Sequence, residues 1–438
     1  PPLWLAMLRT TANTDLGIEH LLSAVRKELL MARLKESLRK SHIQNFALAL
    51  VRQAEINEYV FAVSDQERQR LEQIFIKIDA VRDGSRAALD NLLLKALYVP
   101  ISRLLADGGT DMDCQAIRPK ALADLIATHM AERRVQAEMA QDIKSLGIID
   151  NDVSQNVARL YEQNPYPRWT SLHVPTPPRR RQHFLTYFSK QALSFMDSPY
   201  KVLIAGSGTG QQAIDAALGY GPNAVLTAID LSLASLAYGK RMAGQFEADN
   251  VQFIQCDILN VDLLERQFDV IECIGVLHHM DDPWAGWKIL VDNLRPGGLM
   301  KIGLYSRAAR RTIASLREDI KARGVIDDDQ AIRDYRQNIM TQGEDGKGAF
   351  LLGSADFYSL SNFRDLMFHV SEQHLTILEI SAFMAANGLT FHGFHIPHDI
   401  APEYPIGDDS HDLEKWRKFE NAHPDTFKGM YVFWCRKD

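Results

Sequence analysis

The sequence predicts an α/β protein in which a long all-helical region precedes a parallel, doubly wound sheet. Residues 1–150 carry helical periodicity and no motif with an obvious chemical role. A proline-rich stretch over residues 161–181 then interrupts that pattern. After it, short apolar runs alternate with helical segments, and strands separated by helices form right-handed crossovers in a parallel sheet. We therefore expect two domains, residues 1–150 and residues 151–438.

The helical region contains clear signals for helix starts. Asp15 precedes apolar residues spaced three and four apart, and Ser64 with Glu67 has the form of a capping box. Further helical segments are expected over residues 42–60, 86–105 and 119–146. Such a region packs against a catalytic domain or recognises a substrate or partner, and periodicity does not separate these roles.

Composition and charge narrow the classes of protein. The chain has 438 residues, enough for two or three domains, and its 46% hydrophobic content excludes wholesale disorder. A net charge of −7 disfavours nucleic acid as a partner, because phosphate binding needs clustered basic residues. The basic run at residues 179–181 is an exception that we interpret as a solvated turn.

Cysteine usage and hydropathy predict the compartment. The four cysteines are dispersed, which is typical of a reducing compartment and argues against disulfides or a zinc site. We find neither a secretory leader nor an apolar run of the ~18 residues that a membrane-spanning helix needs. We therefore expect a cytoplasmic protein without a membrane partner. Because the chain begins at Pro1 without Met, we expect part of the native N-terminus to be missing.

Three histidines near the C-terminus raise the question of a metal site. They are His392, His395 and His398, followed by Asp399. The first two are three residues apart in a predicted strand, so they would point to opposite faces. A metal site needs converging ligands, and we therefore expect none here.

A glycine-rich turn follows the first predicted strand, residues 202–204. The turn consists of Gly206, Ser207, Gly208, Thr209 and Gly210, and a helix begins at Gln211. Glycine is needed where a backbone turns tightly or lies against a ligand with no Cβ between them. One residue separates the second and third glycines, whereas dinucleotide-binding turns have two. The turn therefore favours a ligand without a pyrophosphate.

Two carboxylates follow later strands. Asp230 ends the second strand, residues 224–229, where it can accept hydrogen bonds from both hydroxyls of a ribose. Asp257 follows the third strand, residues 251–255, where it can accept one from an adenine amino group, with Ile258 against the base. Together with the glycine-rich turn, these positions predict an adenosine site.

The order of these motifs carries a family resemblance. The fourth predicted strand, residues 268–273, leads into Gly-Val-Leu-His-His-Met at residues 275–280, and a Leu-Arg-Pro-Gly-Gly turn leads into a fifth strand, residues 299–304. Over residues 195–305 the whole set resembles the class I S-adenosylmethionine-dependent methyltransferases, and the His-His stretch resembles their small-molecule and quinone branch. The helical region and residues 161–169 are similar to a bacterial group often linked to tetratricopeptide repeats.

The resemblance implies a fold and a cofactor. The fold is a Rossmann-like, seven-stranded methyltransferase sheet whose last strand is antiparallel, with its last two strands at residues 389–394 and 430–434. The cofactor is S-adenosylmethionine, converted to S-adenosylhomocysteine. The implied cofactor contacts are Gly206, Ser207, Gly208, Gly210, Gln211, Asp230, Leu231, Asp257, Ile258, Ile274, Tyr161 and Arg168.

One position departs from the family. Its members usually have an acidic residue just before the first glycine, which helps to orient the methionine part of the cofactor, and this chain has Ala205. Gln211, Gln212 or Arg168 can substitute for that acid.

The candidate catalytic residues follow the fourth and fifth strands. Methyl transfer from a sulfonium is an in-line displacement in which the protein mainly aligns and desolvates the reactants. His278 and His279 lie at the edge where ligands bind in such sheets, and histidine is the natural base near neutral pH. With Tyr305 they are the catalytic candidates. The alternative is that one histidine packs over the cofactor while the other faces solvent.

The segment at residues 161–169 has two interpretations. In one, Tyr161 and Arg168 contact the cofactor beneath a lid, and Tyr166 and Trp169 contact the substrate. In the other, the segment is a proline-stiffened linker whose aromatic side chains pack into the interdomain core, and Arg168 pairs with a surface acid.

An insertion at residues 306–388 enlarges the domain beyond a minimal methyltransferase. Insertions there usually cover the substrate, which makes Phe357, Tyr358, Arg364, His369 and Glu372 substrate candidates, with core packing as the alternative for the aromatic residues. The large accessory regions favour a protein or peptide side chain as methyl acceptor. The His-His stretch keeps a small metabolite open, and Ala205 keeps open a cofactor-binding partner protein without activity.

Overall fold

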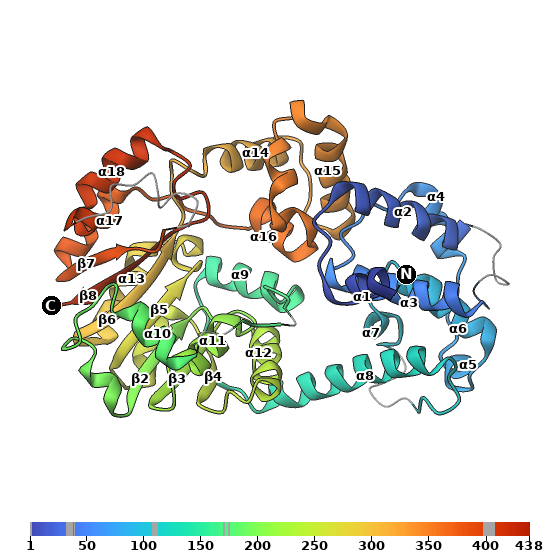
Figure 1. Ribbon diagram of the computed structural model, residues 1–438, viewed down its shortest axis with the longest axis horizontal. Coiled ribbons are helices and arrows are strands. Elements are labelled where there is room, and N and C mark those ends of the chain that lie inside the picture. The colour runs from blue at the N-terminus through green and yellow to red at the C-terminus, as the bar shows by residue number, and fades with distance from the viewer. Residues whose placement is uncertain are drawn as a thin grey trace. The chain divides into compact units, whose positions relative to one another are not determined.

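The chain forms two compact units (Figure 1). The computed structural model describes residues 2–31, 38, 40–106, 113–169, 171–173, 176–396 and 408–438. The helical unit contains Pro1–Ala137 and Leu316–Phe368, and the sheet unit contains Glu138–Ser315 and His369–Asp438. The predicted α/β class is confirmed.

The helical unit is built from helices of very different lengths, from 4 to 22 residues. Its N-terminal part contains α1 (Pro2–Thr10), α2 (Leu16–Met31), α3 (Ser41–Ile56), α4 (Asp65–Glu72), α5 (Ile78–Arg82), α6 (Arg86–Ala96), α7 (Ile101–Leu104) and most of α8 (Lys120–Gln141). Asp15 Oδ1 accepts a hydrogen bond from the Ile18 amide at 2.8 Å at the start of α2. Ser64 and Glu67 form the reciprocal capping box of α4. Both predicted helix starts are therefore confirmed.

Three predicted helices end earlier than expected or are divided. The helix predicted over residues 42–60 is α3, which ends at Ile56. The pattern at residues 86–105 divides into α6 and α7, with Pro100 between them, because proline lacks the amide hydrogen that a continuous helix needs. The pattern at residues 119–146 gives α8 only as far as Gln141, and its last residues form a strand.

Residues 316–368, the middle part of the insertion predicted after the fifth strand, belong to the helical unit. This part contains α15 (Asp329–Gln342), α16 (Leu360–Phe368) and most of α14 (Arg311–Ala322). Arg336 on α15 donates two hydrogen bonds of 2.6 Å to the carboxylate of Glu19 on α2, and both side chains are buried. Segments about three hundred residues apart in sequence therefore share one core.

The sheet unit contains an eight-stranded sheet in the order β1-β4-β3-β2-β5-β6-β8-β7. Its strands are β1 (Lys144–Leu146), β2 (Tyr200–Ala205), β3 (Ala224–Asp230), β4 (Val251–Cys256), β5 (Phe268–Ile274), β6 (Leu294–Leu304), β7 (Leu389–Phe394) and β8 (Tyr431–Lys437). Strands β1 to β6 pair in parallel, and β8 is antiparallel to both β6 and β7. The Rossmann-like sheet and its antiparallel last strand are confirmed.

The eighth strand is β1, which sequence periodicity assigned to a helix. Lys144 and Leu146 stand in register with Ile254 and Cys256 at the edge of the sheet. A three-residue strand has no periodicity of its own, so only its pairing partner reveals it.

Helices cover both faces of the sheet (Figure 1). On one face lie α13 (Pro283–Asn293), α17 (Ile377–Ala386) and α18 (Leu413–Ala422), packed on one buried apolar core. On the other lie α10 (Pro177–Phe184), α11 (Gln211–Gly219) and α12 (Leu233–Gln245) on a second core. Among the described residues, we found no helix with the length and apolar character needed to cross a membrane.

Candidate cofactor and active site

The glycine-rich turn joins β2 to α11 at the carboxyl edge of the sheet. Gly206, Gly208 and Gly210 adopt φ angles of 73°, 51° and 81°, a region that favours glycine. A Cβ on Gly206 would lie 2.3 Å from Val276, and one on Gly208 would lie 2.6 Å from the Tyr166 carbonyl oxygen. The turn therefore requires glycine for its backbone conformation and for close packing.

Asp230 connects the turn to β3. Its Oδ2 accepts a hydrogen bond from the Gly208 amide at 2.8 Å, and its Oδ1 accepts one from the Ser232 amide at 2.9 Å. Burial raises the pKa of this carboxyl group, while the backbone amides oppose the shift. Asp230 remains partly exposed, with Leu231 beside it, so it can still meet a ligand.

Asp257 caps a short 3-10 helix after β4. Its Oδ1 accepts a hydrogen bond from the Leu259 amide at 3.0 Å, and its side chain is buried. Ile258 is also buried, whereas Ile274 ends β5, which lies on the other side of β2 in the strand order. The two predicted carboxylates therefore follow adjacent strands at one edge.

The segment before the sheet lies against the glycine-rich turn. It leaves α9 (Asp152–Gln163), and its Tyr166 carbonyl oxygen accepts a hydrogen bond from the Thr209 amide at 3.2 Å. Trp169 is buried and donates from Nε1 to the Thr209 carbonyl oxygen at 3.3 Å. Tyr161 and Tyr166 are half-buried and stacked 6.1 Å apart, whereas Arg168 is exposed.

Both interpretations of this segment have some support. It covers the turn as a lid would, while Trp169 packs into the sheet unit against Tyr238 and Phe246 as a linker residue would. Contact of Tyr166 and Trp169 with a substrate stays a prediction.

The two histidines of the His-His stretch are buried beside Tyr305, just past β6. The ring of His278 stacks on Tyr305 with centroids 3.8 Å apart, and the ring of His279 stacks on His369 at 3.6 Å. His279 Nδ1 lies 2.7 Å from the Ser371 carbonyl oxygen. The structure therefore brings together all three catalytic candidates and one substrate candidate, His369.

Burial controls the charge of His278. Its side chain is 0% exposed, and neither ring nitrogen has a hydrogen-bond partner in the described parts of the chain. Burial holds the pKa of His278 well below its usual value, and the neighbouring His279 and Arg310 lower it further. At neutral pH the imidazole is therefore uncharged.

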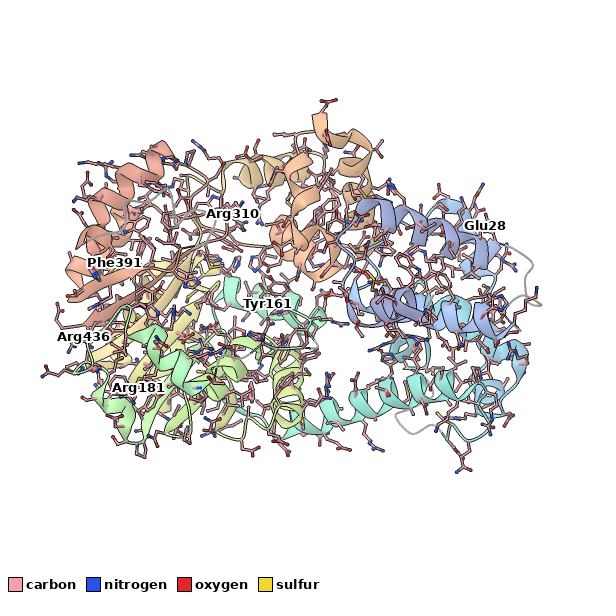
Figure 2. All side chains as sticks on the ribbon, viewed as in Figure 1. Glu28, Tyr161, Arg181, Arg310, Phe391 and Arg436 are labelled. Carbon is pink, nitrogen blue, oxygen red and sulfur yellow. The ribbon has the colours of Figure 1, made fainter. Side chains whose placement is uncertain are left out.

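Sequence reasoning missed Arg310, which lies behind Tyr305 and pairs with the substrate candidate Glu372. The Arg310 guanidinium lies 3.5 Å from the centre of the Tyr305 ring, and its Nη2 is 3.1 Å from Glu372. Glu372 also lies 2.6 Å from His374 Nε2. Figure 2 labels Arg310 near the end of β6 and Tyr161 on α9. No local motif marks Arg310, because its partners come from the distant segment at residues 371–374.

Three substrate candidates belong to the helical unit. The Phe357 ring lies 4.1 Å from the Arg336 guanidinium, and the Tyr358 hydroxyl donates to the Leu352 carbonyl oxygen at 2.8 Å. Arg364 pairs with Asp327 at 2.8 Å and with Asp329 at 2.6 Å. All three side chains are buried among partners of that unit, and their role in substrate binding stays a prediction.

The C-terminal histidines contact different neighbours. His392 Nδ1 lies 3.0 Å from the Tyr187 carbonyl oxygen, and the His395 ring lies 5.8 Å from that of His183. His398 and Asp399 lie outside the described residues.

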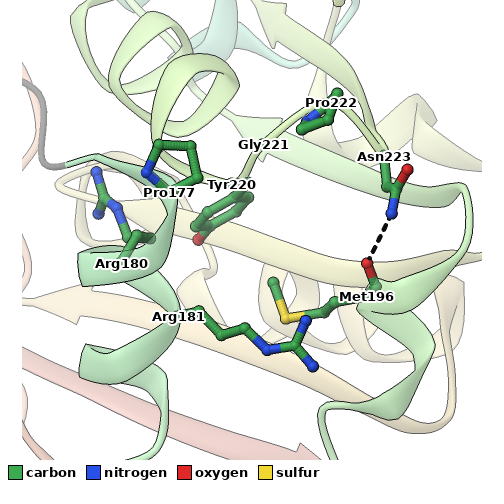
Figure 3. A pocket seen from close by; sticks show the side chains of 9 residues that line it. Pro177, Arg180, Arg181, Met196, Tyr220, Gly221, Pro222 and Asn223 are labelled. Atoms are coloured by element: carbon green, nitrogen blue, oxygen red, sulfur yellow. Dashed lines mark hydrogen bonds between the residues drawn. The ribbon is translucent and has the colours of Figure 1, made fainter.

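A cavity of about 320 Å³ opens at the other edge of the sheet, between α10 and the loop that precedes β3 (Figure 3). It is lined by Pro177, Arg180, Arg181, Met196, Gly219, Tyr220, Gly221, Pro222 and Asn223. Both arginines have carboxylate partners, Asp215 for Arg180 and Asp197 for Arg181. Ligands of such sheets bind outside the carboxyl ends of the strands, so this cavity is separate from the cofactor edge.

Comparison with known proteins identifies a domain within the chain. Residues 196–345 match the model of a family described as a methyltransferase domain. The chain carries a methyltransferase domain. The match covers the glycine-rich turn, Asp230, Asp257 and the His-His stretch.

Individual relatives resemble parts of this methyltransferase. An uncharacterised protein from Synechococcus is 28% identical over 291 residues, which are 61% of this chain and 68% of that protein. The tRNA 5-carboxymethoxyuridine methyltransferase of Escherichia coli is 36% identical over 108 residues, which are 24% of this chain and 40% of that enzyme.

Solved structures resemble the fold at low sequence identity. PKMT2 from Rickettsia typhi is 17% identical, with a TM-score of 0.45, and the match covers 62% of this chain and 54% of that one. The methyltransferase thus spans about half the length of PKMT2. Magnesium protoporphyrin IX methyltransferase from Synechocystis is 11% identical, with a TM-score of 0.35, and the match covers 67% of this chain and all of that one.

The residues at the carboxyl edge fit S-adenosylmethionine. The turn has glycine where a Cβ would collide, and α11 begins directly after it with Gln211 half-buried at its first position. Asp230 and Asp257 supply acceptors on the β3 and β4 side, where they can hold an adenosine. His278 and Tyr305 lie on the β5 and β6 side, where they can face a methyl acceptor.

Proposed function

We propose that this methyltransferase transfers a methyl group from S-adenosylmethionine to a side chain of a protein or peptide. The path of the chain from the sheet unit to the helical unit and back supports this proposal. The helical unit takes its second segment, Leu316–Phe368, from the connection that follows β6, and the chain returns at His369, which stacks on His279. A large recognition unit is therefore joined through its covalent connections to the edge where the methyl acceptor is expected.

Methyl transfer from a sulfonium needs little acid–base catalysis. When bound, the cofactor supplies an activated methyl group on a sulfonium. His278, with a pKa well below its usual value, is a weak base at neutral pH, and its burial beside Tyr305 excludes water. We propose that His278, His279 and Tyr305 mainly align and desolvate the acceptor, and that a neutral imidazole nitrogen takes a proton only from an acidic acceptor.

A small metabolite is the second candidate acceptor. His278, His279 and Tyr305 are all nearly inaccessible, which favours a small closed site over an open groove. In that case the helical unit would bind a partner rather than the acceptor.

Labelled cofactor distinguishes the candidates. The protein is incubated with cell extract and S-adenosylmethionine labelled in its methyl group, and the extract is separated into protein, nucleic acid and small molecules. We expect label in the protein fraction. Label only among small molecules would support the second candidate, and label in nucleic acid would contradict both.

A matched variant provides the control for that experiment. Asp230→Ala removes the acceptor of the Gly208 and Ser232 amides and the predicted ribose contact, so it should abolish labelling. If wild-type protein binds the cofactor by titration calorimetry but labels no fraction, the partner protein without activity becomes the better interpretation.

A further inference from the structure

A buried carboxylate, that of Glu272, lies in the central part of the sheet. On one side of it are β3 and β4, at whose ends lie Asp230 and Asp257, and on the other is β6, which precedes Tyr305. Glu272 is on β5 and stands in register with Ile204 on β2, one residue before Ala205. The chain leaves β2 toward β3, whereas β5 lies on the other side of β2, so the crevice between β2 and β5 is the topological switch point of the sheet. Glu272 is 3% exposed.

Glu272 holds a side chain of the first turn of α11. Its Oε2 accepts a hydrogen bond from Gln212 Nε2 at 2.6 Å, and its Oε1 accepts one from the Tyr220 hydroxyl. Its neighbour on β6, Lys301, places its ammonium group over the Trp434 ring instead, 5.6 Å from the ring centre. Both carboxylate oxygens therefore have uncharged donors.

The contact with Glu272 fixes the orientation of the Gln212 amide. A carboxylate accepts only, so the amide must present its nitrogen to Glu272, and its oxygen is left as the acceptor. We find no hydrogen bond to Gln212 Oε1 in the described parts of the chain, and the side chain is half-buried rather than enclosed. Gln212 thus offers a preoriented carbonyl oxygen beside the glycine-rich turn.

The direction of the cofactor follows from the strand order. The predicted site would hold the adenosine with residues after β3 and β4, and would turn the methyl group toward His278 and Tyr305, after β5 and β6. The methionine part would then span the crevice between β2 and β5, where Gln212 lies and where Ala205 supplies no acceptor.

We propose that Gln212, oriented by Glu272, binds the amino group of the methionine part of the cofactor. An amide oxygen accepts a hydrogen bond from an ammonium group as a carboxylate does, although without the opposite charge. The acceptor missing at Ala205 is thus supplied from the first turn of α11, and Glu272 acts as a positioning residue.

Two ligands that differ in the amino acid part test this assignment. S-adenosylhomocysteine carries the amino and carboxylate groups, whereas 5′-methylthioadenosine lacks both and keeps the adenosine. In Gln212→Met we expect the affinity for S-adenosylhomocysteine to fall about tenfold and that for 5′-methylthioadenosine to stay within about twofold, as measured by titration calorimetry. Equal affinities of wild type and variant for S-adenosylhomocysteine would overturn the proposal, as would equal losses for both ligands.

Two further variants separate positioning from simple structural support. Glu272→Met frees the Gln212 amide to rotate. It should therefore also lower the affinity for S-adenosylhomocysteine more than the affinity for 5′-methylthioadenosine. Tyr220→Phe removes the other donor to Glu272 and should leave the ratio of the two affinities unchanged. If Glu272→Met does not fold, the two affinities of Gln212→Met still test the proposal. That variant should fold, because the Gln212 side chain is only half-buried. These measurements need no methyl acceptor, so they are independent of the acceptor proposed above.

Discussion

His278 shows how burial sets the chemistry of one residue. Its ring is enclosed between Tyr305 and the His279 segment, and a charged imidazole there would lose its hydration without gaining a partner. The sequence predicted that this histidine follows β5 at the carboxyl edge of the sheet, and it lies there. Its protonation state was not predictable, because the groups that set it, Arg310 and His374 among them, are distant in sequence.

The lowered pKa of His278 predicts a loss of stability in acid. The folded pKa lies below the ~6.5 of an unfolded chain, so as pH falls through 6.5 the unfolded state takes up a proton that the folded state does not. The free energy of unfolding should therefore decrease from pH 7 to pH 5.5, by about 1 kcal/mol from this residue. Urea unfolding at several pH values measures it.

The variant His278→Phe should keep the ring stack on Tyr305 and lose this part of the pH dependence. His173→Gln, at an exposed position, should behave as wild type and serves as the control. A pH dependence of His278→Phe identical to that of wild type would refute the assignment.

The glycine-rich turn carries the next prediction, at the scale of an element. In Gly208→Ala the new Cβ would meet the Tyr166 carbonyl oxygen at 2.6 Å, on a backbone with a φ of 51°. The segment at residues 164–169 must then move off the turn. We expect affinity for S-adenosylmethionine to fall at least tenfold and stability to fall by about 1–3 kcal/mol, measured by calorimetry and urea unfolding.

A second glycine provides the matched control. Gly244 lies in α12, and a Cβ there would have no atom within 4 Å. Gly244→Ala should therefore stabilise the protein by about 0.5–1 kcal/mol and leave cofactor affinity unchanged. Similar behaviour of the two variants would mean that the turn does not need glycine at position 208.

Local pattern predicted some elements and not others. The buried strands β2 to β6, the capping box at Ser64 and the turn at Gly206 have signals within a few residues of sequence. Local pattern did not predict the strand β1 or the break between α6 and α7 at Pro100. The residues of β1 follow a helix without a change of pattern, and they form a strand only by pairing with β4.

At the scale of the whole molecule, the buried ion pair of Glu19 and Arg336 joins two distant segments of the helical unit. Both side chains are at most 2% exposed. Glu19→Ala leaves an uncompensated buried charge on Arg336, so we expect the free energy of unfolding to fall by about 3–5 kcal/mol. The double variant Glu19→Leu with Arg336→Met should recover most of that loss.

Hydrogen exchange shows whether the two segments form one cooperative unit. In Glu19→Ala we expect the amides of α2 and α15 to lose protection together, because the pair joins these helices. Removing the exposed pair of Asp319 and Arg323 by Arg323→Ala should change stability by less than about 0.5 kcal/mol. Loss of protection in α2 alone would contradict a shared core.

The sequence by itself predicted the sheet and the cofactor, and it placed the candidate site residues at one edge of that sheet. These depend on short apolar runs, glycine positions and carboxylates at strand ends, which act through neighbouring residues. The tertiary structure alone decided that residues 316–368 belong with the N-terminal helices, that His278 is neutral, and that Glu272 contacts the Gln212 amide. Those features depend on burial and on partners distant in sequence, and periodicity does not record which surfaces meet.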